Sequence, residues 1–400
     1  MNIDKGMCLT CKGGRNLCGL GYCPLMEKMK LQIPIQERAS KEEIFGPTPP
    51  NVFVGRANYP NVSWGPMVSL EEKNSELYDT PSQWYGASYQ DIIRFRSSLI
   101  RSEQRANVYE RTRLLEKAQE VVLSIAPVDV EMQFARKPTY TVSFSQINQP
   151  MGPSAPLKDF RVCENPEIPK RVDQLANEKI KAVEAARELS EHGFDIYYLT
   201  KLLSAGVLGI NKKLVPTRWS ITATDDMLSK QQMSRIREYP QLSNFLVYSN
   251  EYLYNHFEIL LLPGAWEFEQ FESWAPGTLW TQGARGMSTV QEYEPFAGRT
   301  AYAQKEGGGY YAGRYGVTEA LDNLRKQARA VVFREIHEGY VLPVGVWEVR
   351  ENVRNAFKNQ PKKFSSLKDA LSDISTRLRV PISTYLKMSS ILQQRKLVDF

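Results

Sequence analysis

Four of the five cysteines in this 400-residue chain lie within its first 23 residues, at Cys8, Cys11, Cys18 and Cys23. The spacing C-x2-C-x6-C-x4-C is typical of a zinc knuckle, because zinc binds four soft ligands in a tetrahedron at about 2.3 Å. Glycines between the cysteines permit tight turns, and a proline after the fourth stiffens the exit. The sequence therefore predicts a knuckle over residues 1–30, with Zn²⁺ as its cofactor.

Two alternatives to a metal remain open, a pair of disulfides and unbound thiols. Disulfides need an oxidising compartment, and no apolar run typical of a secretory signal precedes the cysteines. No stretch of about 18 apolar residues occurs either, so we expect a cytoplasmic protein without a membrane span. Four cysteine ligands leave no coordination position for water, which predicts a structural site. We interpret the fifth cysteine, Cys163, as an ordinary thiol.

The net charge of +6 is concentrated at one end of the chain. Residues 351–400 contain ten Lys or Arg and four Asp or Glu, whereas residues 1–350 contain 41 of each sign. Clustered cations favour a polyanionic partner because they release counterions from a phosphate backbone. A solvated helical face is the alternative, so DNA is an expected partner that charge alone does not establish.

Length and pattern together predict an α+β fold, with mixed helices and short sheets behind the N-terminal zinc knuckle. We expect a zinc knuckle at 1–30, an N-terminal α+β region at 31–165, a C-terminal α+β region at 166–360 and a basic helical tail at 361–400. The tail carries the C-terminal peptide discussed below.

Residue periodicity predicts the following elements. Expected strands lie within 52–67 and at 139–145, 219–224, 257–262, 266–274 and 341–349. Expected helices lie at 86–125 (as one helix or two), 172–192 and 313–336, with two short ones within 365–393 that separate at Pro381. The five prolines of 148–170 predict a long exposed loop.

A polar cluster between residues 292 and 319 contains three consecutive glycines directly before a predicted helix. Backbone N–H groups and the positive end of a helix dipole suit a phosphate, arginines can grip it, and a tyrosine can stack on a base. The candidate contacts to a nucleotide or nucleic acid are Arg299, Gly307, Gly308, Gly309, Tyr310 and Arg314. The lysine of a P-loop is missing. The alternative is a turn that lets the helix pack closely.

The other titratable groups suggest no catalytic motif. His192, His256 and His337 are isolated in sequence without metal-ligand spacing, and we interpret each as a surface or satisfied core histidine. Arg334 and Glu348 could line a site, although a structural ion-pair network explains them better.

The last seven residues form a second distinctive pattern, Gln394-Arg-Lys-Leu397-Val-Asp-Phe400. In a single helical turn, Leu397 and Phe400 share one face because residues three apart are neighbours. Such an apolar pair, with Gln394 beside it, is typical of a peptide that inserts into a pocket of a partner protein. The alternative is a helix end packed on its own domain.

Three stretches of the sequence together resemble one family: the knuckle from Cys8 to Pro24, the block Phe53-Val-Gly-Arg56 with Tyr59-Pro-Asn-Val62, and Gly307-Gly-Gly-Tyr-Tyr311. They resemble the archaeal Nre proteins of the NreA type over nearly the whole chain. The resemblance implies a role in DNA repair and a C-terminal peptide that binds the sliding clamp PCNA. Gln394, Leu397 and Phe400 match the glutamine, aliphatic and first aromatic positions of that peptide. The second aromatic position has no counterpart after Phe400, so we expect a weaker affinity for the clamp.

The sequence thus predicts a DNA repair factor recruited to a PCNA-type sliding clamp. One alternative is an enzyme that acts on a nucleotide or nucleic acid at the Gly307–Arg314 cluster, and another is a scaffold that docks through its knuckle. Whether the chain is an enzyme stays open at this stage.

Overall fold

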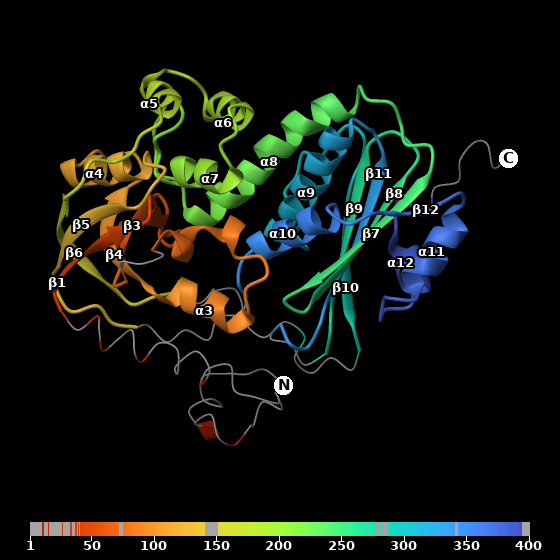
Figure 1. Ribbon diagram of the computed structural model, residues 1–400, viewed down its shortest axis with the longest axis horizontal. Helices are drawn as coiled ribbons and strands as arrows, with labels where there is room; N and C mark the ends of the chain where they lie inside the picture. The colour runs from red at the N-terminus through yellow and green to blue at the C-terminus, as the bar shows by residue number, and fades with distance from the viewer. Residues whose placement is uncertain are drawn as a thin grey trace. The chain divides into compact units, whose positions relative to one another are not determined.

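The computed structural model describes residues 10, 11, 15, 26, 33, 37, 39, 41–71, 75–140, 151–276, 281, 286–340 and 343–393. The chain divides into two compact units, Pro24–Leu228 and Met1–Cys23 together with Ser229–Phe400. Each unit is built on a six-stranded mixed sheet with helices, which confirms the predicted α+β class (Figure 1). No helix within the described ranges combines the length and apolar character needed to span a bilayer.

The sheet of the first unit is antiparallel except for one pair of strands. Its strands are β1 (Glu43–Thr48), β2 (Val52–Val54), β3 (Asn61–Ser69), β4 (Leu99–Asn107), β5 (Val128–Phe134) and β6 (Ser154–Val162). They lie in the order β1-β5-β6-β4-β3-β2, and only β4 and β6 run parallel. The alternating burial of β5 fits a strand with one face against the core.

The first unit also contains helices and two short 3₁₀ turns. They are η1 (Ser75–Asp79), η2 (Pro81–Gln83), α3 (Tyr89–Ser97), α4 (Arg113–Val122), α5 (Lys170–Asn177), α6 (Ala182–Glu191), α7 (Ile196–Ser204) and the start of α8 (Thr217–Ile236). Of these, α3, α4 and α7 contact the sheet. Several begin at side-chain caps: the hydroxyl of Ser88 accepts from the Asp91 N–H, and that of Thr112 accepts from the Leu115 N–H, both at 3.1 Å. Such caps satisfy N–H groups that a helix start would otherwise leave unpaired.

The sheet of the second unit is also antiparallel except for one pair. Its strands are β7 (Phe245–Tyr252), β8 (Asn255–Leu262), β9 (Glu267–Trp274), β10 (Ser288–Glu294), β11 (Arg329–Ile336) and β12 (Lys362–Phe364). They lie in the order β10-β9-β11-β8-β7-β12, with β9 and β11 parallel. Every residue of β8 and β11 is buried, since helices cover both faces of the sheet.

Two pairs of helices cover the two faces of this second sheet (Figure 1). They are α9 (Gly308–Leu324) with α10 (Trp347–Ala356), and α11 (Leu367–Ser375) with α12 (Ile382–Met388). Phe257, Ile259 and Leu261 of β8 belong to the core under α9 and α10, whereas Leu260 and Leu262 belong to the core under α11 and α12. The unit therefore has three layers, helices–sheet–helices.

Several predicted elements agree with the structure. Strands lie within 52–67, 257–262 and 266–274, and two short helices within 365–393 are separated at Pro381. Residues 141–145 of the predicted strand 139–145 fall outside the described residues. The ranges 31–165, 166–360 and 361–400 stay predictions of domain limits.

The predicted helices at 86–125 and 313–336 are wrong in part, because each contains a strand. β4 follows α3 directly, and β11 follows α9 after the left-handed residue Arg325. β11 is buried on both faces, so its continuous apolar run lacks the alternation that identifies a strand. The predicted helix 172–192 is interrupted between α5 and α6.

Three further predictions are corrected by the structure. Residues 219–224 are not a strand but part of α8, where the Thr224 hydroxyl donates to the Ser220 carbonyl at 2.8 Å. The described part of 341–349 contains no strand and ends in the first turn of α10. The predicted loop 148–170 includes β6, which pairs with β5 from Leu157 to Val162, and the carbonyl of its Pro156 accepts from the Ala135 N–H at 2.9 Å.

Candidate functional site

The predicted metal site and the predicted C-terminal peptide lie almost entirely outside the described residues. Cys8, Cys18 and Cys23 are not described, and Cys11 is buried. Gln394, Leu397 and Phe400 follow the last described residue, Gln393. Among the residues that are described, no group of three or more His, Cys, Asp or Glu side chains is arranged to hold a metal ion. Zinc binding and clamp binding both stay predictions.

The triple glycine lies at the start of α9 in the second unit. Gly307 is the N-cap residue and has a φ of 56°, a conformation that favours glycine. A β-carbon at Gly309 would overlap with Oε1 of Glu272, and one at Gly313 would overlap with Oε1 of Gln270. The glycines therefore bring α9 directly onto the polar side chains of β9, as the close-packing alternative predicts.

A cluster of buried carboxyl groups lies under this face of α9 and shares one guanidinium. Arg334 of β11 binds Glu272 of β9 at 2.6 Å and Glu348 of α10 at 3.2 Å. Arg334 also donates twice to Oδ1 of Asn255, at 3.0 and 2.8 Å. Burial opposes its charge, but Glu272 and Glu348 outweigh burial and raise the pKa of Arg334. The guanidinium therefore stays charged.

The acids of this cluster hold protons more firmly than ordinary carboxyl groups. Burial raises the pKa of Glu348 to about 7, against the opposing charge of Arg334. Burial, followed by the negative charge of Glu272, raises the pKa of Glu306 well above its usual range. One positive charge faces these three acids, so they do not all ionise together at neutral pH.

The contact between Glu306 and Gln270 supports a proton on Glu306. The Gln270 amide donates to Oε2 of Glu306 at 2.8 Å. Within the described part of the chain, Oε1 of Gln270 and Oε1 of Glu306 are buried and have no hydrogen-bond partner. Protonation would convert one of these two acceptors into a donor and so relieve the cost of burying them unpaired. We expect Glu306 to be a neutral carboxylic acid in the folded protein.

The predicted phosphate-binding residues lie together at the start of α9, but protein carboxylates already engage their charges. Arg314 is fully buried and binds Glu294 at 2.5 Å, and the Tyr310 hydroxyl donates to the same carboxylate at 2.7 Å. Arg299 binds Glu292 at 2.9 Å. A phosphate would have to compete with these carboxylates, and contact with a nucleic acid here stays a prediction.

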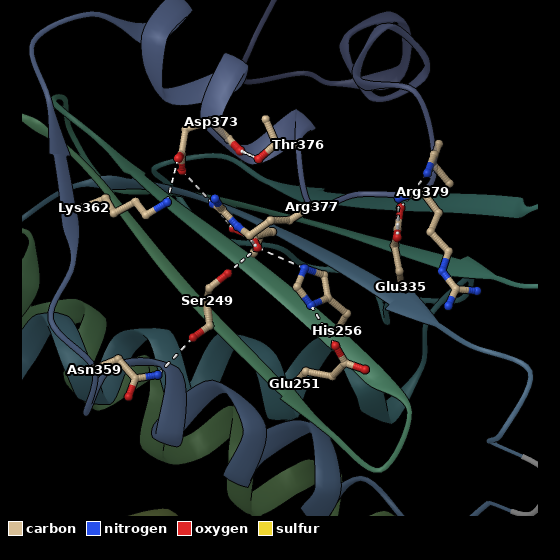
Figure 2. A network of polar contacts seen from close by, with 12 residues as sticks. Ser249, Glu251, His256, Glu335, Asn359, Lys362, Asp373, Thr376, Arg377 and Arg379 are labelled. Atoms are coloured by element: carbon tan, nitrogen blue, oxygen red, sulfur yellow. Dashed lines mark hydrogen bonds and ion pairs between the residues drawn. The ribbon is translucent and has the colours of Figure 1, made fainter.

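A second polar network lies on the opposite face of the same sheet (Figure 2). Its centre is Glu258, a fully buried residue of β8 that accepts from both Nε and Nη2 of Arg377, at 2.7 and 2.8 Å. Arg377 also binds Asp373, which binds Lys362. Burial alone would raise the pKa of Glu258, but hydrogen bonds from Arg377 and other donors outweigh burial and lower it. This network fixes the segment after α11 to the sheet.

Two of the histidines, isolated in sequence, meet beside this network. The rings of His256 and His337 stack with their centroids 6.4 Å apart, and Nδ1 of each lies within 4 Å of Glu251. Nε2 of His256 also contacts Glu258 at 2.9 Å, and Figure 2 shows His256 beside Glu251. Sequence reasoning missed this pair because β8 and β11 bring together residues that are 81 positions apart. We assign the pair a structural role.

Sequence reasoning also missed the residues that complete the cluster under α9. The notable signal is β9, where Glu267, Glu269, Gln270 and Glu272 place polar side chains on both faces of a strand. Both faces are nevertheless buried, so these side chains need partners from other elements. Arg334, interpreted from the sequence as part of an ion-pair network with Glu348, is the partner of Glu272 and also binds Glu348.

Comparison with known proteins gives matches over nearly the whole chain. Residues 17–281 match the family described as "Archaeal Nre, N-terminal", and residues 294–400 match "Archaeal Nre, C-terminal". The chain is 37% identical to the DNA repair protein NreB of Archaeoglobus fulgidus, over 98% of this chain and 99% of the relative. It is 38% identical to NreA of the same organism, over 93% of each chain. It is 34% identical to NreA of Haloferax volcanii, over 91% of this chain and 90% of the relative. No solved structure matches.

Proposed function

The chain belongs to the archaeal Nre family, and we propose on that premise that it is a DNA repair factor. The observation that carries this proposal is the similarity itself. Relatives named DNA repair proteins align with at least 90% of this chain and of their own lengths. Both structural units are therefore shared with those relatives.

The finer part of the proposal is recruitment to a PCNA-type sliding clamp through Gln394, Leu397 and Phe400. The support is the sequence pattern, in which an aliphatic and an aromatic residue three positions apart can enter one pocket. α12 ends at Met388, so the peptide follows the folded unit closely in sequence. A clamp bound there would hold the repair factor on DNA.

Isothermal titration of the full chain with the cognate clamp tests this recruitment. We expect Phe400→Ala to weaken binding about tenfold or more, because a buried aromatic anchor dominates such interfaces. Val398→Ala is the matched control, since it removes an aliphatic side chain from the same segment outside the three anchor positions. Equal affinities for the wild type and Phe400→Ala, or no heat of binding at all, would contradict the proposal.

We also propose that Cys8, Cys11, Cys18 and Cys23 bind one structural zinc ion. The support is their spacing, together with the burial of Cys11. Elemental analysis of the purified full chain should find about one zinc per chain. Cys11→Ser should lower the zinc content, whereas Cys163→Ser, which changes an exposed cysteine, should not. Wild-type protein without zinc would refute this site.

An enzymatic function is the second candidate, and one observation favours it. Glu306, a buried acid whose pKa burial raises well above its usual range, directly precedes the glycine turn at Gly307. A positioned acid of this kind can serve in general acid catalysis. If a nucleotide binds here, it should raise the unfolding temperature of the wild type but not that of Arg314→Ala. Equal protection of both proteins would place the nucleotide elsewhere.

A further inference from the structure

Three aromatic side chains of the unit Pro24–Leu228 are exposed although their rings offer large apolar surfaces. Tyr59 is 41% exposed, Tyr109 57% and Trp219 43%. The rings of Tyr59 and Trp219 contact each other, with centroids 5.0 Å apart and planes at 55°. The fold leaves these rings accessible to a partner. We call Tyr59, Tyr109, Trp219 and the cations beside them, Arg111 and Lys213, the aromatic patch.

The backbone holds the three segments of the aromatic patch together. Asn61 and Asn107 pair across β3 and β4, and the amide of Asn107 donates to Oδ1 of Asn61 at 3.1 Å. The next residue, Val108, donates its N–H to the Pro60 carbonyl at 2.9 Å. The Val108 carbonyl accepts from the Leu214 N–H at 2.9 Å. These hydrogen bonds link Pro60, Val108 and Leu214. Each of these three residues is next in sequence to a member of the aromatic patch: Tyr59, Tyr109 and Lys213.

The segments that carry these rings are rich in cations and contain one acid. Nζ of Lys213 lies 5.9 Å from the centre of the Tyr109 ring. Arg111 is exposed and donates to the Asn211 carbonyl at 3.3 Å. Segments 56–61, 105–111 and 210–219 together contain six Lys or Arg and one acid, Glu110. This balance favours a polyanion over an apolar protein surface.

We propose that the aromatic patch binds single-stranded DNA. Unpaired bases would stack on Tyr109 and Trp219, since every base offers a π-face to an exposed ring. Lys213 and Arg111 would contact the phosphates between those bases. Tyr310, which the sequence predicted as a stacking residue, is a fully buried residue of α9. The inference rests on the proposed role in DNA repair and adds a DNA surface separate from the C-terminal peptide.

Fluorescence anisotropy of the full chain with a labelled oligothymidylate of about 15 nucleotides tests the aromatic patch. We expect Tyr109→Ala and Trp219→Ala each to weaken binding about five- to a hundredfold, whereas Tyr109→Phe and Trp219→Phe retain most of the affinity. Phe45→Ala is the matched control, because Phe45 is 61% exposed in the same unit but lies on β1, outside the patch. Unfolding temperatures establish that every variant is folded.

The salt dependence of binding tests the cations. Lys213→Ala should lower the slope of log affinity against log salt by about 0.7. Lys137→Ala, which removes an exposed lysine outside the patch, should leave this slope unchanged. A duplex of equal length should bind more weakly, because its bases are already stacked. The proposal is overturned if the wild type does not bind the oligothymidylate, if Tyr109→Ala and Trp219→Ala bind it as Phe45→Ala does, or if the duplex binds equally well.

Titration of the same variants with the clamp separates this inference from the proposed recruitment. Tyr109→Ala and Trp219→Ala should bind the clamp as the wild type does, and Phe400→Ala should bind the oligothymidylate as the wild type does. Loss of clamp binding by the patch variants would show that the patch is a protein surface and would overturn the inference. If Phe400→Ala binds the clamp as tightly as the wild type does, the recruitment proposal fails, but the inference of a DNA-binding patch is unaffected.

Discussion

At the scale of single residues, Glu348 lies fully buried between Arg334 and Asn352, and burial raises the pKa of its carboxyl group to about 7. In the unfolded chain the group should release its proton near the ordinary value of 4.5. Between these pH values the folded state binds more protons than the unfolded state, so the free energy of unfolding falls as pH rises. The loss across this window is on the order of 3 kcal/mol.

The substitution Glu348→Gln keeps the shape of the side chain and removes its titration. We therefore expect the stability of the variant to fall less steeply than that of the wild type between about pH 5 and pH 7. Urea unfolding at several pH values measures this slope. Glu116→Gln, which changes an exposed glutamate at the start of α4, should leave the slope unchanged. A wild-type slope in Glu348→Gln would refute the proposed titration.

The candidate residues at the start of α9 could be predicted from the sequence as one site because they are close in the chain. Arg299, Gly307 and Arg314 lie within one short stretch, and the structure brings them together at the start of α9. Glu272 and Arg334 could not be assigned to the same site, since they meet only when β9 and β11 pair in parallel. The pairing of two distant strands depends on the whole sheet, and no local pattern encodes it.

At the scale of secondary structure elements, Arg377 connects the segment after α11 to the sheet. It is 25% exposed, whereas its partner Glu258 is fully buried. Arg377→Ala should therefore destabilise the unit by about 3 kcal/mol, because it leaves a buried carboxylate without its cation. Arg379→Ala removes an arginine that is 51% exposed and pairs with an exposed acid, Glu338, so it should cost at most about 1 kcal/mol.

Chemical denaturation of both variants measures this difference. The double variant Arg377→Ala with Glu258→Gln should recover part of the lost stability, since the buried group is then neutral. Equal effects of Arg377→Ala and Arg379→Ala would show that the Glu258 network does not hold the helical segment to the sheet.

The predicted helix 313–336, which spans most of α9 and all of β11, shows why amphipathic patterns were insufficient to separate a helix from a strand. α9 is buried along most of its length, and β11 is buried on both faces. Neither element therefore alternates between apolar and polar residues, and their combined pattern resembles one long helix. β8 is equally buried but was recognised as a strand, because its apolar run is short and separate from any helical pattern.

At the scale of the whole molecule, the chain passes between its compact units within a helix rather than in a loop. The border between Leu228 and Ser229 lies inside α8. The sequence carries no local signal of this border, because α8 contains no Gly or Pro that would mark one. The two family matches divide the chain elsewhere, between residues 281 and 294.

The two proposed contacts lie on different units, which predicts an effect that neither contact produces alone. The C-terminal peptide follows the unit that contains Ser229–Phe400, whereas the aromatic patch belongs to Pro24–Leu228. If one chain engages a clamp and single-stranded DNA together, the second contact becomes intramolecular, and the affinity exceeds that of either contact alone. We expect the full chain to bind a clamp loaded beside a single-stranded gap at least about tenfold more tightly than a free clamp.

Binding of the full chain to loaded and free clamps, followed by surface plasmon resonance, measures this gain. Tyr109→Ala should lose the gain but keep its affinity for the free clamp, because it removes only the DNA contact. Phe400→Ala should retain only the affinity for single-stranded DNA. Phe45→Ala should behave as the wild type does. An equal affinity of the wild type for loaded and free clamps would show that one chain does not use both surfaces at once, even if each surface binds its own partner.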